Sequence, residues 1–351
     1  MATNEKHHYV PQFYLKNFSV ENNRKTIALY NHKNGTFVSN ASIKGQAYER
    51  FLYGEDNIVE AELSKLESEA AKLFHDPITK IIPPLEIPTF RILKQYILAQ
   101  LARTTKAGKD TIEMLNQAYQ KLHPYLSKQY GLNEQSFMLS HKFPSLLSVL
   151  FALQNLPMMN FLIIKSFVNL TQIPFITSDA PVILYNQFME SKGDYLGATG
   201  LAIMGLQIFF PIHPRLMYCL YDPKTYIIGD PDKISFPIND EMDIHQLNAL
   251  QYLFSNSHLY FDETISVEYI KKLVQDFEPF RIENKTIVET FTEKNEGKEK
   301  FYLFSSFTDP HINLDLPFIK LTRKAKSTSL NGDLPFRHPW FYEFERKRRK
   351  A

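Results

Sequence analysis

The sequence predicts an α+β fold with an N-terminal β-hairpin, a helical middle section and a mostly antiparallel sheet in the second half. Three features support this prediction. Apolar and polar residues alternate around Asn34-Gly35, apolar stripes recur at helical spacing between about 56 and 156, and β-branched and aromatic residues are concentrated from about 159 to 320. With 351 residues, of which 44% are hydrophobic and 22% charged, the chain can bury a large core.

The hairpin is predicted from the segment TIALYNHKNGTFVSN, whose Asn34-Gly35 pair favours a type I′ turn with positive φ at both central residues. Helical periodicity then predicts a helix from Asp56 to Phe74 and a second one that carries the apolar stripe from Phe90 to Thr104. Three more helices are expected, roughly Asp110 to Leu122, Pro144 to Asn155 and Asp240 to Asn256.

The second half of the chain supplies the strands. NFLIIKSFVNL and IPFITSDAPVILYN are predicted as neighbouring strands, LQIFFPI and LMYCLYD as a strand pair, and HLYF, TIVETF and KFYLFSSF as later strands. No fixed repeat divides the chain. We therefore expect a single globular domain over residues 1–341, with a helical subregion at about 56–156, a sheet-rich subregion at about 159–320, and a basic tail at 342–351.

Composition limits the class of protein. Forty Lys and Arg residues against 38 Asp and Glu residues leave a net charge of +2, so no overall field draws the chain to nucleic acid or to an anionic membrane. A single cysteine, Cys219, excludes an intrachain disulfide and fits a reducing, cytoplasmic setting. The start of the chain lacks the apolar segment of a signal peptide, and polar residues interrupt the most apolar stretch at 144–170. We expect no membrane association.

The segment KHHYVPQFYLKNF near the N-terminus is the first candidate for a functional site. His7 and His8 can change charge near neutral pH or bind a metal. Because neighbouring side chains point in opposite directions on an extended chain, we expect one histidine to face a site and the other to be packed or solvated. Tyr9, Pro11 and Gln12 would then hold the segment in place.

Two carboxylates fall inside an apolar helical stripe. Glu60 and Glu67 share a helix face with Leu63 and Ala70, and a carboxylate near a core needs a partner. In one interpretation both side chains lie at the margin of the stripe and reach water. In the other they face a polar pocket to which the next helix contributes Gln100 and Arg103, whose guanidinium binds carboxylates and phosphates.

A third group of candidates lies in the second half. Ser178 and Asp179 stand at a predicted strand end, where acidic side chains commonly face a site, although an Asx-turn that shapes the loop is an equally ordinary role. Asn248 on the late helix could contact a ligand in the same pocket. Its alternative role is that of an interior amide bonded to the backbone.

These residues together resemble a known family. The segments HHYVPQFYLKNF, AQLARTT, FITSDAPV, FFPIHPR and LNAL, with Glu60 and Glu67 between the first two, are similar to a widespread bacterial family known only as domain of unknown function 4238. The resemblance spans roughly Lys6 to Phe261. It implies that eleven positions match the family pattern, namely His7, His8, Tyr9, Pro11, Gln12, Glu60, Glu67, Arg103, Ser178, Asp179 and Pro181.

The chain departs from that pattern at two points. A further basic residue usually follows the Arg-Thr pair, where this chain has Thr105-Lys106-Ala107-Gly108-Lys109, and an Asn usually stands at the position of Ala180. The resemblance implies no established reaction.

Three functions fit the candidate residues. The first is a metal-dependent phosphoesterase, acting for example on nucleic acid, with His7, His8, Glu60, Glu67, Arg103 and Asp179 as catalytic residues. In it Glu60, Glu67 and Asp179 bind Mg²⁺ or Mn²⁺, and Arg103 holds the phosphate. The second is a non-catalytic sensor in which Tyr9, Gln12, Gln100, Ser178 and Asn248 help to bind a nucleotide or another small anionic ligand. The third is a buried polar network that only fixes the fold.

Overall fold

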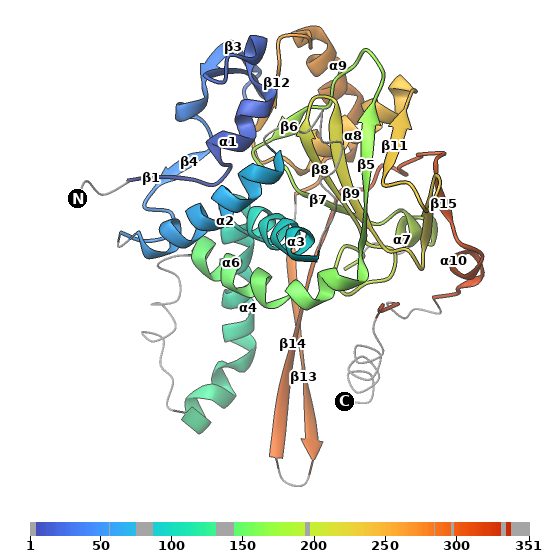
Figure 1. The fold of residues 1–351 in the computed structure, drawn as a ribbon. Helices are drawn as coiled ribbons and strands as arrows, with labels where there is room; N and C mark the ends of the chain where they lie inside the picture. The colour runs from blue at the N-terminus through green and yellow to red at the C-terminus, as the bar shows by residue number, and fades with distance from the viewer. Residues whose placement is uncertain are drawn as a thin grey trace.

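The computed structural model describes residues 5–55, 57–74, 87–130, 144–193, 197–283, 285–295, 298–330 and 335–337. Figure 1 shows a helical layer, made of α2, α3, α4 and α6, beside a sheet-rich half. The N-terminal segment lies over the junction of the two. These helices are α2 (Ile58–Phe74), α3 (Ile87–Ala102), α4 (Thr105–Tyr130) and α6 (Pro144–Gln154). The others are α1 (Gln12–Leu15), α7 (Gln187–Ser191), α8 (Glu241–Phe254), α9 (Val267–Phe277) and α10 (Arg323–Ser327).

The strands form two larger sheets and three small ones. The five-stranded sheet has the order β11 (Ser235–Ile238), β5 (Ile163–Asn169), β9 (Leu216–Tyr221), β8 (Gln207–His213) and β7 (Ile183–Tyr185). The four-stranded sheet has the order β3 (Thr36–Ser42), β2 (Thr26–Asn31), β12 (His258–Phe261) and β6 (Thr177–Ser178). Three pairs complete the set, namely β1 (Lys6–His8) with β4 (Tyr48–Arg50), β10 (Tyr226–Ile228) with β15 (Ile319–Leu321), and β13 (Thr286–Asn295) with β14 (Lys298–Phe307).

The predicted fold class is confirmed. The structure is α+β, β2 and β3 form an antiparallel hairpin, and only the β5–β11 pair is parallel among the strand pairs of the described residues. The predicted turn type is wrong. In the loop between β2 and β3, Gly35 has a φ of 71° but Asn34 is not left-handed, and the Gly35 N–H donates to the Asn31 carbonyl. Four loop residues separate the strands, so the tight two-residue turn is not needed.

Two segments predicted as neighbouring strands lie apart. The residues of IPFITSDAPVILYN divide between β6 in one sheet and β7 in the other, and β5 pairs with β9 and β11 instead. The predicted pairing of LQIFFPI with LMYCLYD is confirmed as the β8–β9 hairpin. Local pattern predicts a strand well, but its partner depends on contacts distant in sequence.

The N-terminal motif is inserted into the core. Tyr14, in α1, is fully buried and stacks on Phe210 of β8 with ring centroids 5.2 Å apart. Its hydroxyl donates to the Pro211 carbonyl at 2.6 Å and lies 2.6 Å from the Thr177 hydroxyl, so it bonds to both larger sheets. These contacts explain how a segment so close to the chain start is held in place.

Side chains of the long helix α4 form hydrogen bonds to the base of the β13–β14 hairpin. Gln117 donates to the Thr286 carbonyl at 2.7 Å and accepts from the Val288 N–H at 3.1 Å, while Lys121 donates to the Val288 carbonyl. Figure 1 shows the hairpin extending away from the sheets alongside α4. One end of this hairpin therefore faces the helical layer.

None of the helices in the described ranges is both long and apolar enough to cross a membrane. The basic tail at 342–351 lies outside the described residues. The prediction of one domain over 1–341 stays a prediction.

Candidate functional site

The two histidines of the motif point in different directions, as expected for strand β1. His7 is fully buried and its ring stacks on Tyr53, with centroids 5.6 Å apart. The Tyr53 N–H donates to His7 Nδ1, so Nε2 carries the proton and donates to Asn57 Oδ1 at 3.0 Å. These contacts hold His7 against the β4–α2 connection.

His8 has the opposite tautomer. Its Nδ1 lies 3.0 Å from the Gln46 carbonyl, which only accepts, so Nδ1–H donates and Nε2 accepts from Gln12 at 2.9 Å. Burial lowers the pKa of His8, which keeps the ring neutral near neutral pH. His8 and Gln12, both predicted as site residues, therefore bind each other.

Arg103 lies at the centre of the motif contacts. It is 1% exposed, and its Nη1 forms an ion pair with Glu67 Oε1 at 2.7 Å. Nη2 donates to the His8 carbonyl at 2.6 Å, and Nε donates to the Tyr53 hydroxyl at 3.2 Å. The guanidinium thus joins the N-terminal strand, the segment after β4 and helix α2. The predicted partnership of Arg103 with Glu67 is present.

Glu60 is satisfied less completely. Its Oε2 is buried without a hydrogen-bond partner among the described residues. Burial raises the pKa of Glu60, and Glu67 raises it further, while Arg103 and His7 act in the opposite direction. A proton or a bound cation would satisfy this oxygen.

The strand-end residues Ser178 and Asp179 hold β6 to the segment after α8. The Asp179 carboxylate accepts the N–H groups of Asn256, Ser257 and His258 at 2.8–3.0 Å, and the Ser257 hydroxyl at 3.0 Å. Burial raises the pKa of Asp179, but the hydrogen bonds from His258, Asn256 and Ser257 outweigh it and hold the pKa below its usual value. Both carboxylate oxygens are therefore occupied.

Two amides of α8 clamp the same strand. Gln251 accepts the Ser178 hydroxyl at 2.9 Å and donates to the Pro181 carbonyl. Asn248 accepts the Ile176 N–H at 3.0 Å and donates to the Pro174 carbonyl. Asn248 thus has the geometry of an interior amide bonded to the backbone. Gln251 was not predicted, although it follows Asn248 by three residues and therefore lies on the same face of α8.

The three predicted metal ligands do not form one group. Within the described part of the chain, no three His, Cys, Asp or Glu side chains are arranged to hold a metal ion, so Glu60, Glu67 and Asp179 do not meet around one point. Glu67 is paired with Arg103, and Asp179 is bound to backbone N–H groups.

A cavity lies beside this network, between the helical layer and the sheet-rich half. Its volume is about 340 Å³, within the usual range for small-molecule sites. Gln100 is the one predicted site residue among its described lining residues; its Nε2 also donates to the Tyr9 carbonyl at 2.9 Å. The motif therefore supports the cavity wall through Gln100, while its histidines face elsewhere.

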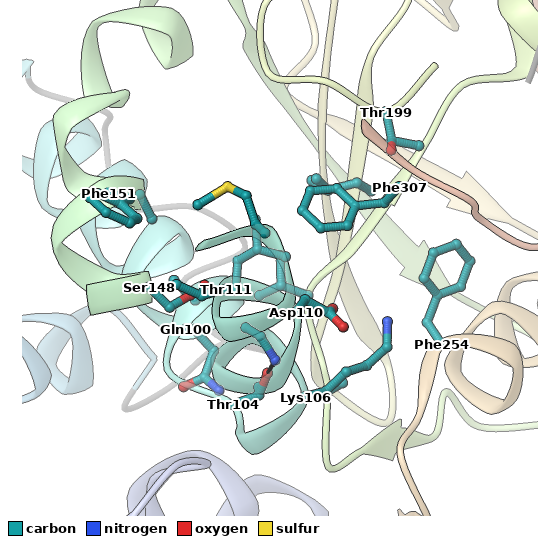
Figure 2. Close-up of a pocket in the computed structure, with 18 of the residues that line it drawn as sticks. Gln100, Thr104, Lys106, Asp110, Thr111, Ser148, Phe151, Thr199, Phe254 and Phe307 are labelled. Atoms are coloured by element: carbon teal, nitrogen blue, oxygen red, sulfur yellow. Dashed lines mark hydrogen bonds between the residues drawn. The ribbon is translucent and has the colours of Figure 1, made fainter. Parts of the chain in front are cut away.

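The cavity has an apolar wall and three charged groups. Figure 2 shows Lys106 and Asp110 extending from α4 toward Phe254 and Phe307 on the opposite side. Asp309, which follows β14, is 8% exposed and accepts a hydrogen bond from the Thr199 hydroxyl. Burial raises the pKa of both Asp110 and Asp309, although Lys106 acts in the opposite direction on each. These three charged residues were not predicted from the sequence.

No local pattern marks these charges as a site. Lys106 and Asp110 are four residues apart on an amphipathic helix, which usually indicates a solvated face. Asp309 lies 199 residues after Asp110 in the sequence, and only the hairpin base brings it to α4.

Residues 6–264 match the model of a family described as protein of unknown function (DUF4238), so this chain belongs to that family. The suspected family is confirmed. Comparisons with curated proteins and with solved structures found no match. Ser305, Phe307 and Asp309 lie beyond the matched range, so part of the cavity wall comes from outside the family region.

Proposed function

We propose that this protein binds a small organic molecule in the cavity between the helical layer and the sheets. The observation that carries the proposal is a space of about 340 Å³ with an apolar wall and a few polar groups, the usual character of a ligand site. The charged groups support it. Among the described residues, the side chains of Lys106 and Asp110 form no hydrogen bond or ion pair, and the Asp309 carboxylate accepts from the Thr199 hydroxyl alone.

A substitution that fills the cavity tests this proposal. Ala107 lines the space, and Ala107→Trp should abolish the binding of small molecules while the protein stays folded, because the added indole occupies the site. Binding is measured by ligand-observed NMR with a library of fragment-sized molecules. Ala61→Trp, on the exposed face of α2, is the matched control and should bind like the unchanged protein. Equal binding by the two variants would contradict the proposal.

A metal-dependent phosphoesterase is the second candidate function. One observation favours it: the buried Oε2 of Glu60, near Arg103 and His7, has no hydrogen-bond partner among the described residues. Carboxylate oxygens are the ligands that Mg²⁺ and Mn²⁺ prefer, and Arg103 could assist with a phosphate only if it left Glu67.

This second candidate predicts the behaviour of Glu60→Gln. Because the folded-state pKa of Glu60 is raised, its charged form weakens folding as the pH rises through that pKa, so the Gln variant should melt at the same temperature or higher at pH 7. Under the phosphoesterase hypothesis the variant also loses Mn²⁺ binding and phosphodiester hydrolysis. Calorimetric titration with Mn²⁺ measures the binding. If the unchanged protein takes up no Mn²⁺, or if the variant binds it equally well, this candidate is rejected.

A further inference from the structure

The described side chains that line the cavity carry more negative than positive groups. Among the described residues that line it, Lys106 is the cationic side chain, and Asp110 and Asp309 are the anionic ones. A ligand that carries a negative charge would face two carboxylates and one ammonium. A ligand that carries a positive charge would restore the balance.

The two carboxylates also have few protein donors among the described residues. Asp309 is buried and its carboxylate receives one hydrogen bond, from the Thr199 hydroxyl, in the described part of the chain. Burial raises the pKa of Asp309 and of Asp110, so the ionised forms are incompletely stabilised by the protein itself. An ionised carboxylate removed from water needs charged or N–H donors, and an ammonium group provides three of them.

The remaining wall suits an organic cation better than a metal ion. Phe254 and Phe307 stand opposite the charged side chains of α4, with Phe151 and Met114 also on the lining. Aromatic rings attract organic cations and pack against an apolar body. A metal ion would need several oxygen or nitrogen ligands together, and the described residues offer no group of three such acidic, histidine or cysteine side chains.

We infer that the cavity is selective for a small amphipathic amine, with its ammonium group bound by Asp110 and Asp309 and its apolar body against Phe254 and Phe307. This inference rests on the proposed ligand-binding function. It also assigns roles to the charges: the two aspartates attract the ligand, and Lys106 opposes its binding and limits the affinity.

Three probes of nearly equal shape test the selectivity: 2-phenylethylamine, which is cationic at pH 7, the neutral 2-phenylethanol, and the anionic 3-phenylpropanoate. They are titrated by ligand-observed NMR in the presence of EDTA, which removes any metal. We expect the amine to bind at least about tenfold more tightly than either other probe, the effect of one charge-assisted contact. Ala107→Trp should abolish this binding.

Variants that remove one charge each then show which side chains make the cavity selective for an amine. Asp110→Asn and Asp309→Asn should each weaken amine binding by about tenfold, and Lys106→Met should strengthen it. Asp110 and Lys106 are only partly buried, so their variants report on binding even if Asp309→Asn alters stability.

The outcomes separate this inference from the proposed function. If the neutral or anionic probe binds in the cavity as well as the amine, and Ala107→Trp blocks it, the selectivity is wrong and the proposed function stands. If Mn²⁺ without EDTA displaces the amine at micromolar concentration, the aspartates form a metal site and the inference is also wrong. If none of the three probes binds, the inference is rejected, and the proposed function is then decided by the fragment library alone.

Discussion

Replacing Arg103 by Met is expected to destabilise the protein by about 3–5 kcal/mol, the cost of leaving a buried ion pair with one partner. The guanidinium is 1% exposed and bonds to the Glu67 carboxylate, the His8 carbonyl and the Tyr53 hydroxyl. Methionine fills much of the volume but leaves these three groups without their donor. Urea unfolding followed by far-UV circular dichroism measures the loss.

Three variants serve as controls. Arg91→Met lies on the exposed face of α3, the helix that ends just before Arg103, and should change the free energy of unfolding by less than about 0.5 kcal/mol. Arg103→Lys keeps the charge but not the three-way geometry, so its effect should be intermediate. Adding Glu67→Gln to Arg103→Met should recover part of the loss, because the uncompensated carboxylate is removed. A fully stable Arg103→Met variant would show that this network does not support the fold.

Replacing Asp179 by Asn is expected to cost about 2–4 kcal/mol at pH 7, because an amide cannot accept the N–H groups of Asn256, Ser257 and His258 with both of its terminal atoms. The change keeps the size of the side chain, so the effect reports on the lost acceptor oxygen and on the lost attraction between the carboxylate and His258. Asp232→Asn, at an exposed position, is the matched control and should be neutral. A stable Asp179→Asn variant that lost a catalytic activity would instead indicate a catalytic carboxylate.

The pH dependence of this effect has a definite sign. Hydrogen bonds hold the folded-state pKa of Asp179 below its ordinary value of 3.8. A depressed carboxyl pKa contributes stability that is present above the unfolded value and is lost as the pH falls through the folded value. The difference in unfolding free energy between the unchanged protein and Asp179→Asn should therefore be constant from pH 7 to pH 5 and shrink below pH 3.8.

Arg103 and Asp179 both belong to the family pattern, and the expected effect of replacing either one is a loss of stability. His8, Gln12, Arg103 and Glu67 bind one another or the backbone, and Asp179 binds backbone N–H groups. Through these contacts, the residues of the family pattern fasten the N-terminal strand and strand β6 to the helices around them. The cavity lies next to this framework, and Gln100 belongs to both.

Much of the local structure could be predicted. Glycine and asparagine mark the β2–β3 loop, and the apolar stripes place α2, α3, α6 and α8 within a few residues of their observed ends. α4 is longer than predicted, since it already begins at Thr105, where the hydroxyl of the preceding Thr104 accepts the Ala107 N–H as a cap. α9 was not predicted, although its buried residues Ile270 and Leu273 recur at helical spacing.

Part of the polar network could also be predicted. A carboxylate inside an apolar stripe needs a cation, and Arg103, at the end of the next helix, was a suitable one. The direction of each histidine could not be predicted, because it depends on Asn57 and Gln46 in loops whose path is set by tertiary packing.

The sequence by itself determined the fold class, the family and the pairing of Arg103 with Glu67, because periodicity, motifs and the charge needs of buried groups can be read along the chain. Only the tertiary structure decided where the cavity lies. Lys106, Asp110, Thr199 and Asp309 become neighbours because the base of the β13–β14 hairpin packs against α4 beside the sheet, and residues so far apart in sequence carry no shared pattern that would predict their meeting.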